Sequence, residues 1–165
     1  MKALIVLLSL CCLLSSCSKK SLDYADDVPC AEIMDIAERQ LPVDFGYETF
    51  GSEHLSLYFE GARTADDHCL RYSALSEDIN EFGIFHTPDG KSIKETEEMC
   101  EEYLEDLWEE KQAFIASYAP EELPKLKDAE VRTFGRYTVY AILDQDDRAL
   151  LFDTVKKSVE KKDQS

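Results

Sequence analysis

The side chains best suited to covalent chemistry are few and widely spaced. Three of the six cysteines, Cys30, Cys69 and Cys100, lie in the body of the chain. No two of them form a CxxC pair, which argues against a thioredoxin-like redox motif. Because their number is odd, at most one disulfide forms among them, either Cys30–Cys69 or Cys69–Cys100, and only in an oxidising compartment. Cys100 falls on an apolar helical stripe, so we expect it to be a small buried side chain.

The three histidines, His54, His68 and His86, show no HExxH motif or other paired spacing. Asp66, His68 and Cys69 are close enough in sequence to form one edge of a zinc site, but the other ligands would have to come from elsewhere. We interpret them as exposed residues at the start of a strand. The chain also lacks a GxSxG elbow and a glycine-rich phosphate loop. We therefore predict no catalytic residue, no metal ligand and no cofactor, and hence no enzyme.

Carboxylates are abundant, and their number weakens the argument for any particular pair. With 35 acidic residues in the chain, two of them meet a glycosidase-like spacing by chance. Residues 94–111 alone hold nine acidic residues and two lysines on one predicted helix. This face is either a surface for calcium or a basic partner, or a solvated face that keeps the protein soluble. The residues of this candidate partner surface are Glu98, Glu101, Glu102 and Glu105.

Aromatic side chains crowd residues 45–59, where Phe45, Tyr47, Phe50, Tyr58 and Phe59 occur within 15 positions. Such a group forms either a platform for a glycan or peptide, or a cover for the core beneath a loop. We keep Tyr47 and Phe50 as a second candidate partner surface.

The charge of the chain narrows the range of partners. Of its 18 basic residues, Lys2, Lys19 and Lys20 precede Ser21, whereas all 35 acidic residues follow it. The part from Ser21 onward therefore carries a net charge of −20. Such a domain repels nucleic-acid phosphates and anionic lipid headgroups, which excludes nucleic acid as a partner and the domain face as a membrane-docking surface.

The N-terminus has the pattern of a removable targeting segment. Lys2 precedes an apolar run over residues 3–14, whose 12 residues match a signal-peptide core. A membrane-spanning helix needs about 20 residues. The sequence Leu14-Ser15-Ser16-Cys17 is similar to the lipobox of bacterial lipoproteins, in which the cysteine is lipidated and becomes the new N-terminus. We predict lipid attachment at Cys17 by acyl chains such as palmitate, each buried methylene contributing roughly 0.8 kcal/mol.

This interpretation divides the chain into four parts. Residues 1–16 are a lipoprotein signal peptide, and residues 17–27 are the lipidated cysteine and a flexible tether. Residues 28–161 are a single globular domain, and residues 162–165 are a disordered tail. The predicted location is the extracytoplasmic face of the bacterial cell membrane.

Apolar periodicity predicts helices over 28–41, 52–59, 92–118 and 144–159, and strands over 69–75, 80–86, 131–134 and 137–143. Ser92, with Glu95 three residues later, predicts a capping box. Gly135-Arg136 suits a type II′ turn between the last two strands. The stripe of the long helix is Ile93, Cys100, Leu104, Leu107, Trp108, Phe114, Ile115 and Tyr118, and the inner face of the last helix is Ala149, Phe152, Val155 and Val159.

These elements predict an α+β fold. We expect a two-layer domain whose four-stranded, mostly antiparallel sheet consists of two hairpins. The long amphipathic helix and the C-terminal helix are expected on one face of that sheet.

One stretch resembles a known family. Gly83-Ile84-Phe85 precedes the long acidic helix, which ends in SYAPEEL at residues 117–123, and KLKDA at 125–129 and Gly135-Arg136-Tyr137 follow. This pattern resembles a domain-of-unknown-function family of small lipoproteins from Gram-positive anaerobic bacteria, over about residues 52–159. Thr138 departs from it, since an apolar residue is commoner there. The resemblance implies the α+β fold and the envelope location, and it implies no activity.

Together these patterns predict a membrane-anchored extracytoplasmic lipoprotein. We expect a non-enzymatic binding or accessory module, with an envelope protein or a small ligand as its partner besides the membrane. Two alternatives stay open: a cation-binding lipoprotein for calcium or zinc, and an envelope hydrolase with an unrecognised carboxylate pair. The hydrolase requires a cleft that holds a carboxyl group of raised pKa.

Overall fold

The structure is a computed structural model that describes residues 23–42, 46–59, 62, 64–90 and 92–161. The predicted signal peptide, Cys17, residues 17–22 of the tether, Phe45 and the predicted tail lie outside the described residues. The elements in chain order are α1 (Cys30–Glu38), β1 (Tyr47–Thr49), α2 (Ser52–Tyr58), β2 (Asp67–Ser73), β3 (Glu81–His86), α3 (Ile93–Tyr118), α4 (Leu123–Lys127), β4 (Glu130–Phe134), β5 (Tyr137–Ile142) and α5 (Gln145–Val159).

The strands form one antiparallel sheet in the order β1-β2-β3-β5-β4. The α+β class and both predicted hairpins, β2–β3 and β4–β5, are confirmed. The sheet has five strands where four were predicted, because Tyr47–Thr49 pairs with the edge of β2. The middle strands, β3 and β5, are buried at every position, which is typical of strands covered on both faces.

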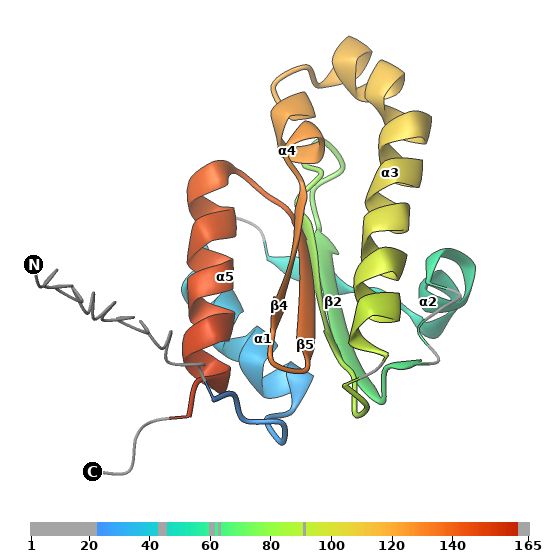
Figure 1. The fold of residues 1–165 in the computed structure, drawn as a ribbon. Helices are drawn as coiled ribbons and strands as arrows, with labels where there is room; N and C mark the ends of the chain where they lie inside the picture. Colours follow the sequence, from blue (N-terminus) through green and yellow to red (C-terminus); the bar gives the residue numbers. More distant parts are fainter. Residues whose placement is uncertain (1–22, 43–45, 60–61, 63, 91, 162–165) are drawn as a thin grey trace, which may run out of the picture.

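The helices cover both faces of this sheet, so the domain has three layers (Figure 1). On one face, Phe82 and Ile84 pack in the same cluster as buried side chains of α1 and α5. On the other face, Phe85 and Tyr140 pack with α3. The prediction that the long helix and the C-terminal helix share one face is therefore wrong. The physical reason is that the central strands are apolar on both faces, and each face needs its own cover.

Helix α3 is longer than the sheet beneath it. Its 26 residues extend about 39 Å, whereas a strand of seven residues extends about 23 Å. The last turns therefore project beyond the sheet (Figure 1). Phe114 and Tyr118, which the predicted stripe placed inside, are 62% and 76% exposed. Cys100 is fully buried, as predicted.

Several local details differ from the predictions. Ser92 stands at the N-cap of α3, but no side-chain bond forms there, so the capping box is absent. Ala149 is exposed, and Leu151 occupies the buried face of α5 instead. Gly135 has φ +64°, which agrees with the predicted glycine-led turn. None of the helices in the described part of the chain is both long and apolar enough to cross a membrane.

Candidate functional site

The candidate site is built on one row of side chains across the sheet. Tyr72 in β2, Glu81 in β3 and Ile142 in β5 are directly paired across neighbouring strands. Directly opposed residues point to the same face of an antiparallel sheet. In this row that face is the one covered by α3, because Glu81 is bonded to Tyr103 of that helix.

Glu81 is a buried acid held by two tyrosines. The residue is 8% exposed, and its Oε1 accepts hydrogen bonds from the hydroxyls of Tyr103 and Tyr140, both at 2.7 Å. Burial raises the pKa of Glu81 to about 7, while the bonds from Tyr140 and Tyr103 act to lower it. Burial, followed by the charge of Glu81, raises the pKa of both tyrosines, which stay protonated donors.

The position of Tyr140 depends on the absence of a side chain at Gly83. These two residues are paired across β3 and β5. A Cβ atom on Gly83 would lie 2.3 Å from Cε1 of the Tyr140 ring and 3.0 Å from Cγ of Leu70. Glycine therefore lets the ring lie over the strand, so that its hydroxyl reaches Glu81.

A pocket of about 580 Å³ lies beside Glu81 on this face. Its volume is within the range of about 300–1,000 Å³ that is usual for small-molecule sites. The C-terminal half of α3 forms one wall, and residues of α4 and of the β2–β3 connection line the pocket as well. The lining residues are Phe50, Tyr72, Ser73, Asp78, Ile79, Asn80, Glu81, Leu107, Glu110, Lys111, Phe114, Ile115, Leu126 and Ile142.

A buried lysine compensates a second carboxylate of the pocket. Lys125 is 8% exposed, and its ammonium lies 3.1 Å from Oδ1 of Asp78 and 2.8 Å from Oε2 of Glu122. Burial acts to raise the pKa of Asp78, but hydrogen bonds from the Asn80 amide and from Lys125 lower it overall. The pocket therefore holds one carboxyl of raised pKa, Glu81, and one of lowered pKa, Asp78.

The predicted partner residues do not form one surface. Phe50 lines the pocket, with its ring stacked on Tyr72 and His54 at centroid distances of 4.4 and 3.6 Å. Tyr47 packs on the opposite face of the sheet, edge-on to Phe82 at 4.9 Å. The four predicted acidic residues of α3 are exposed, and none of them lines this pocket: Glu98, Glu101, Glu102 and Glu105.

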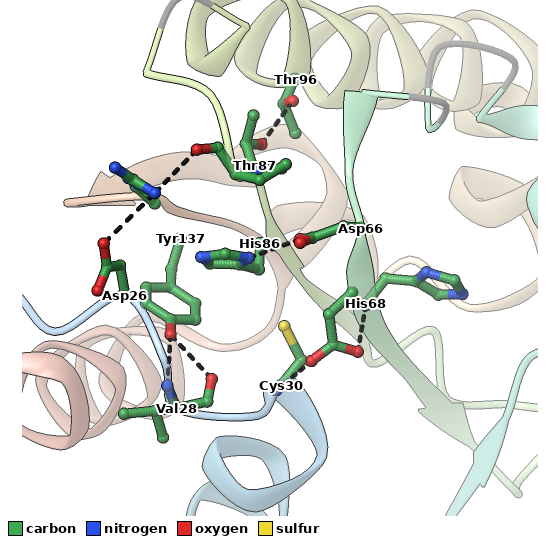
Figure 2. A network of polar contacts seen from close by, with 12 residues as sticks. Asp26, Val28, Cys30, Asp66, His68, His86, Thr87, Thr96 and Tyr137 are labelled. Atoms are coloured by element: carbon green, nitrogen blue, oxygen red, sulfur yellow. Dashed lines mark hydrogen bonds and ion pairs between the residues drawn. The ribbon is translucent and has the colours of Figure 1, made fainter.

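A second polar network lies on the opposite face, where the chain enters α1 (Figure 2). The Tyr137 hydroxyl accepts a bond from the Val28 amide at 2.9 Å and donates one to the Val28 carbonyl at 2.8 Å. The Cys30 amide donates to Asp67 at 2.7 Å. These bonds connect the segment before α1 to strands β2 and β5, so we interpret the network as structural.

This network brings Cys30, His86 and Asp66 into one region, yet it does not activate the thiol (Figure 2). His86 Nδ1 and Asp66 Oδ1 lie 2.6 Å apart, but His86 Nε2 is buried without a partner among the described residues. Cys30 is fully buried, and burial followed by the charge of Asp67 raises the pKa of its thiol. A raised thiol pKa disfavours the thiolate that nucleophilic chemistry requires.

The three described cysteines are free and buried. Cys69 packs on the face of α1 and α5, whereas Cys100 packs on the face of α3. Because the sheet separates them, a Cys69–Cys100 bridge does not form in this fold. His68 is exposed while Cys69 points into the core, so the predicted zinc edge is split. Within the described ranges, no three His, Cys, Asp or Glu side chains converge as metal ligands.

Sequence reasoning missed Glu81 as a site residue. In the strand predicted over 80–86, the apolar alternation puts Phe82, Ile84 and His86 on one face and leaves Glu81 and Gly83 on the other, with no sequence pattern that predicts a cover for that second face. The feature that identifies the site is that helices cover both faces of β3, so that every residue of this strand is buried. A glutamate in a doubly covered strand is a buried acid, and such acids are rare without a partner.

Residues 62–143 match the family model of a domain of unknown function, DUF4358. The match includes strands β2 to β5, helices α3 and α4, and the three side chains of the buried acid cluster, Glu81, Tyr103 and Tyr140. No curated protein and no solved structure matches the chain. Residues 62–143 are thus a DUF4358 domain, a domain whose function is unknown.

Proposed function

We propose that this chain is a lipid-anchored protein of the bacterial cell envelope whose α+β domain binds a small organic ligand beside Glu81. It acts without turning that ligand over, as a binding or accessory module. The lipobox at Cys17 and the resemblance to small lipoproteins of Gram-positive anaerobes support the anchored location. The observation that carries the binding role is the pocket of about 580 Å³ with mainly apolar walls and one buried carboxyl on its floor.

The path of the chain is compatible with an anchor at Cys17. Near the start of the described residues, Tyr24 pairs with Glu160 and lies against Gly135, whose Cβ would be 2.5 Å from that of Tyr24. Gly135 lies in the turn before β5, and Ile142, which lines the pocket, is at the other end of that strand. A six-residue strand extends about 20 Å. An anchored domain would therefore hold the pocket at its membrane-distal end.

The contacts of the two carboxyl groups favour binding over catalysis. Oε1 of Glu81 already accepts two tyrosine hydrogen bonds, and Oδ1 of Asp78 accepts bonds from Lys125 and the Asn80 amide. These bonds hold one oxygen of each carboxyl group in a fixed position, as in a preformed binding site.

An envelope hydrolase is the second candidate, and one specific observation favours it. Glu81 has a raised pKa and Asp78 a lowered one in the same pocket, which is the division of roles that acid–base pairs use. A glycosidic or ester substrate that is hydrolysed by the wild type and left intact by Glu81→Gln and by Asp78→Asn would replace the binding proposal with this one.

The test of the binding role is native mass spectrometry of the full chain recovered from its own membranes, before and after chelation. We expect a bound organic mass that survives chelation and disappears in the pocket variant Ile115→Trp, which narrows the cavity. The exposed variant Ala116→Trp, one residue away, is the matched control. A mass lost on chelation would support the cation-binding alternative instead, and a bare protein would remove the proposal.

The anchor has a separate test. Labelling with an alkyne analogue of palmitate is expected to modify the wild type and Ser18→Ala, and to leave Cys17→Ser unmodified. An unlabelled wild type would contradict the anchored location, and labelling of Cys17→Ser would contradict attachment at Cys17; neither result bears on the pocket.

A further inference from the structure

The three carboxylates that line the pocket differ in whether a basic side chain lies beside them. Asp78 is paired with Lys125 at 3.1 Å, and Glu110 lies 3.9 Å from Lys111. Glu81 is the most deeply buried of the three, and no lysine, arginine or histidine in the described part of the chain forms an ion pair with it. Burying a carboxylate without a counter-ion is costly, and a cation placed beside it recovers much of that cost.

We propose that the pocket binds an amphipathic organic cation, an amine whose ammonium group donates to Glu81 and whose apolar part packs against α3. This inference rests on the proposed binding function and identifies its ligand class. The free lone pairs of the acid are on Oε2, because both tyrosine hydroxyls are bonded to Oε1. An ammonium group brings three donors and a full positive charge to such an acceptor.

The walls fit the rest of such a ligand. Leu107, Ile115 and Ile142 provide an aliphatic surface, and Phe50 and Tyr72 stack together at the side of the sheet. Aromatic faces attract ammonium groups within about 6 Å of the ring. Phe114 lines the same pocket although it is 62% exposed, so a bound ligand would cover apolar surface that is now in water.

Long-range charge favours the same class. The chain from Ser21 onward carries a net charge of −20, which concentrates cations and repels anions at its surface. A bare metal ion fits the surroundings of Glu81 less well than an amine does. The residues paired with Glu81 on the neighbouring strands are a tyrosine and an isoleucine, Tyr72 and Ile142, and neither is a carboxylate. Hard cations need several oxygen ligands.

Three probes of one shape test this inference: phenethylamine, 2-phenylethanol and phenylacetate. Each is titrated into the full chain in mild detergent between pH 5.5 and pH 8.5, with NMR shifts of the tyrosine rings as the readout. We expect phenethylamine to bind at least tenfold more tightly than the other two. Its affinity should rise roughly thirtyfold between pH 5.5 and pH 8.5, because a carboxyl group with a pKa of about 7 goes from almost fully protonated to almost fully ionised over this range.

Two variants make the result specific. Glu81→Gln keeps an acceptor for both tyrosines but has no charge, and it should lower the affinity for phenethylamine at least tenfold. Glu102→Gln removes an exposed acid of α3 and is the control for the net charge of the protein and for partition of the probe into detergent. The affinity of this variant for phenethylamine should change less than twofold. Circular dichroism of Glu81→Gln verifies that it is folded.

The outcomes separate this inference from the function on which it rests. If 2-phenylethanol or phenylacetate binds as tightly as the amine, or if Glu81→Gln binds the amine normally, the cation class is wrong while the pocket still binds small molecules. If none of the three probes binds, the cation class is equally wrong. The native mass experiment then decides the binding function independently.

Discussion

The ring of Tyr140 lies over Gly83, and its hydroxyl donates a hydrogen bond to Glu81 at 2.7 Å. The absence of a side chain at Gly83 therefore allows Tyr140 to reach the buried acid. The two strands that carry these residues, β3 and β5, are the centre of the sheet. The geometry of the candidate site is therefore determined by the middle of the fold and not by a loop. Sites supported in this way hold their side chains more rigidly than sites on loops.

Substitution of Gly83 by alanine should disturb this arrangement. The new Cβ would lie 2.3 Å from the Tyr140 ring, so the ring or the strand must shift. We expect a loss of about 1–3 kcal/mol in the free energy of unfolding, as for other overpacked cores. Urea denaturation measures this loss. The matched control is Gly90→Ala, whose added Cβ has no atom within 4 Å, and an equal loss in both variants would contradict the role of Gly83.

The buried acid should make stability depend on pH. Glu81 has an ordinary pKa of 4.5 when unfolded and about 7 when folded. Between these values the folded state binds more protons than the unfolded state, so stability falls as pH rises. The contribution is fully present below pH 4.5 and is lost by about pH 7, and it is at most about 3 kcal/mol.

Glu81→Gln isolates this contribution, because glutamine does not ionise. The free energy of unfolding of the variant, relative to wild type, should rise between pH 4.5 and pH 7.5. Denaturation curves at several pH values measure the difference, with Glu102→Gln as the exposed control. A difference that stays constant with pH would mean that Glu81 titrates normally.

Each tyrosine should also lower the pKa of Glu81 separately. Tyr103→Phe and Tyr140→Phe each remove one hydroxyl that donates to Oε1, and hydrogen bonds to the charged form stabilise it. We expect the titration midpoint of the Glu81 carboxyl, followed by carbon-13 NMR, to move upward in each variant. The exposed Tyr118→Phe should leave it unchanged. A downward shift in either core variant would show that these hydroxyls accept from a protonated acid instead of donating.

The sequence predicted the elements of this fold better than their arrangement. The strand expected at 80–86 is found at Glu81–His86, and the α+β class follows from such patterns. The short edge strand β1 was missed because three residues are too few to show alternation. Helix α4 was missed because its five residues include a proline near the start.

The wrong layer arrangement and the missed site have one cause. On the face of β3 that α3 covers, two of the three residues are Glu81 and Gly83, which read as polar and small in the sequence. From this pattern, only one face of the strand is expected to pack against helices. In the structure the apolar surface over Gly83 is supplied by Tyr140 from another strand, and such a contribution has no signal in the local sequence.

Substitution of Lys125, at the end of the pocket, tests how much its charge stabilises the carboxylates beside it. Lys125 is 8% exposed and lies between Asp78 and Glu122, so Lys125→Met leaves two partly buried carboxylates without their cation. Breaking a buried ion pair on one side costs about 3 kcal/mol or more. The pKa of Asp78 should rise as well, since the bond from Lys125 helps to lower it.

Thermal unfolding of Lys125→Met should therefore begin well below that of the wild type at pH 7, and the gap should narrow at acidic pH, where Asp78 becomes protonated. The control is Lys94→Met, whose lysine side chain is 80% exposed beside Glu98 and which should lower the unfolding temperature far less. Equal effects of the two substitutions would mean that Lys125 is solvated like a surface residue. A gap that persists at low pH would mean instead that packing of the lysine chain, and not its charge, stabilises this end of the pocket.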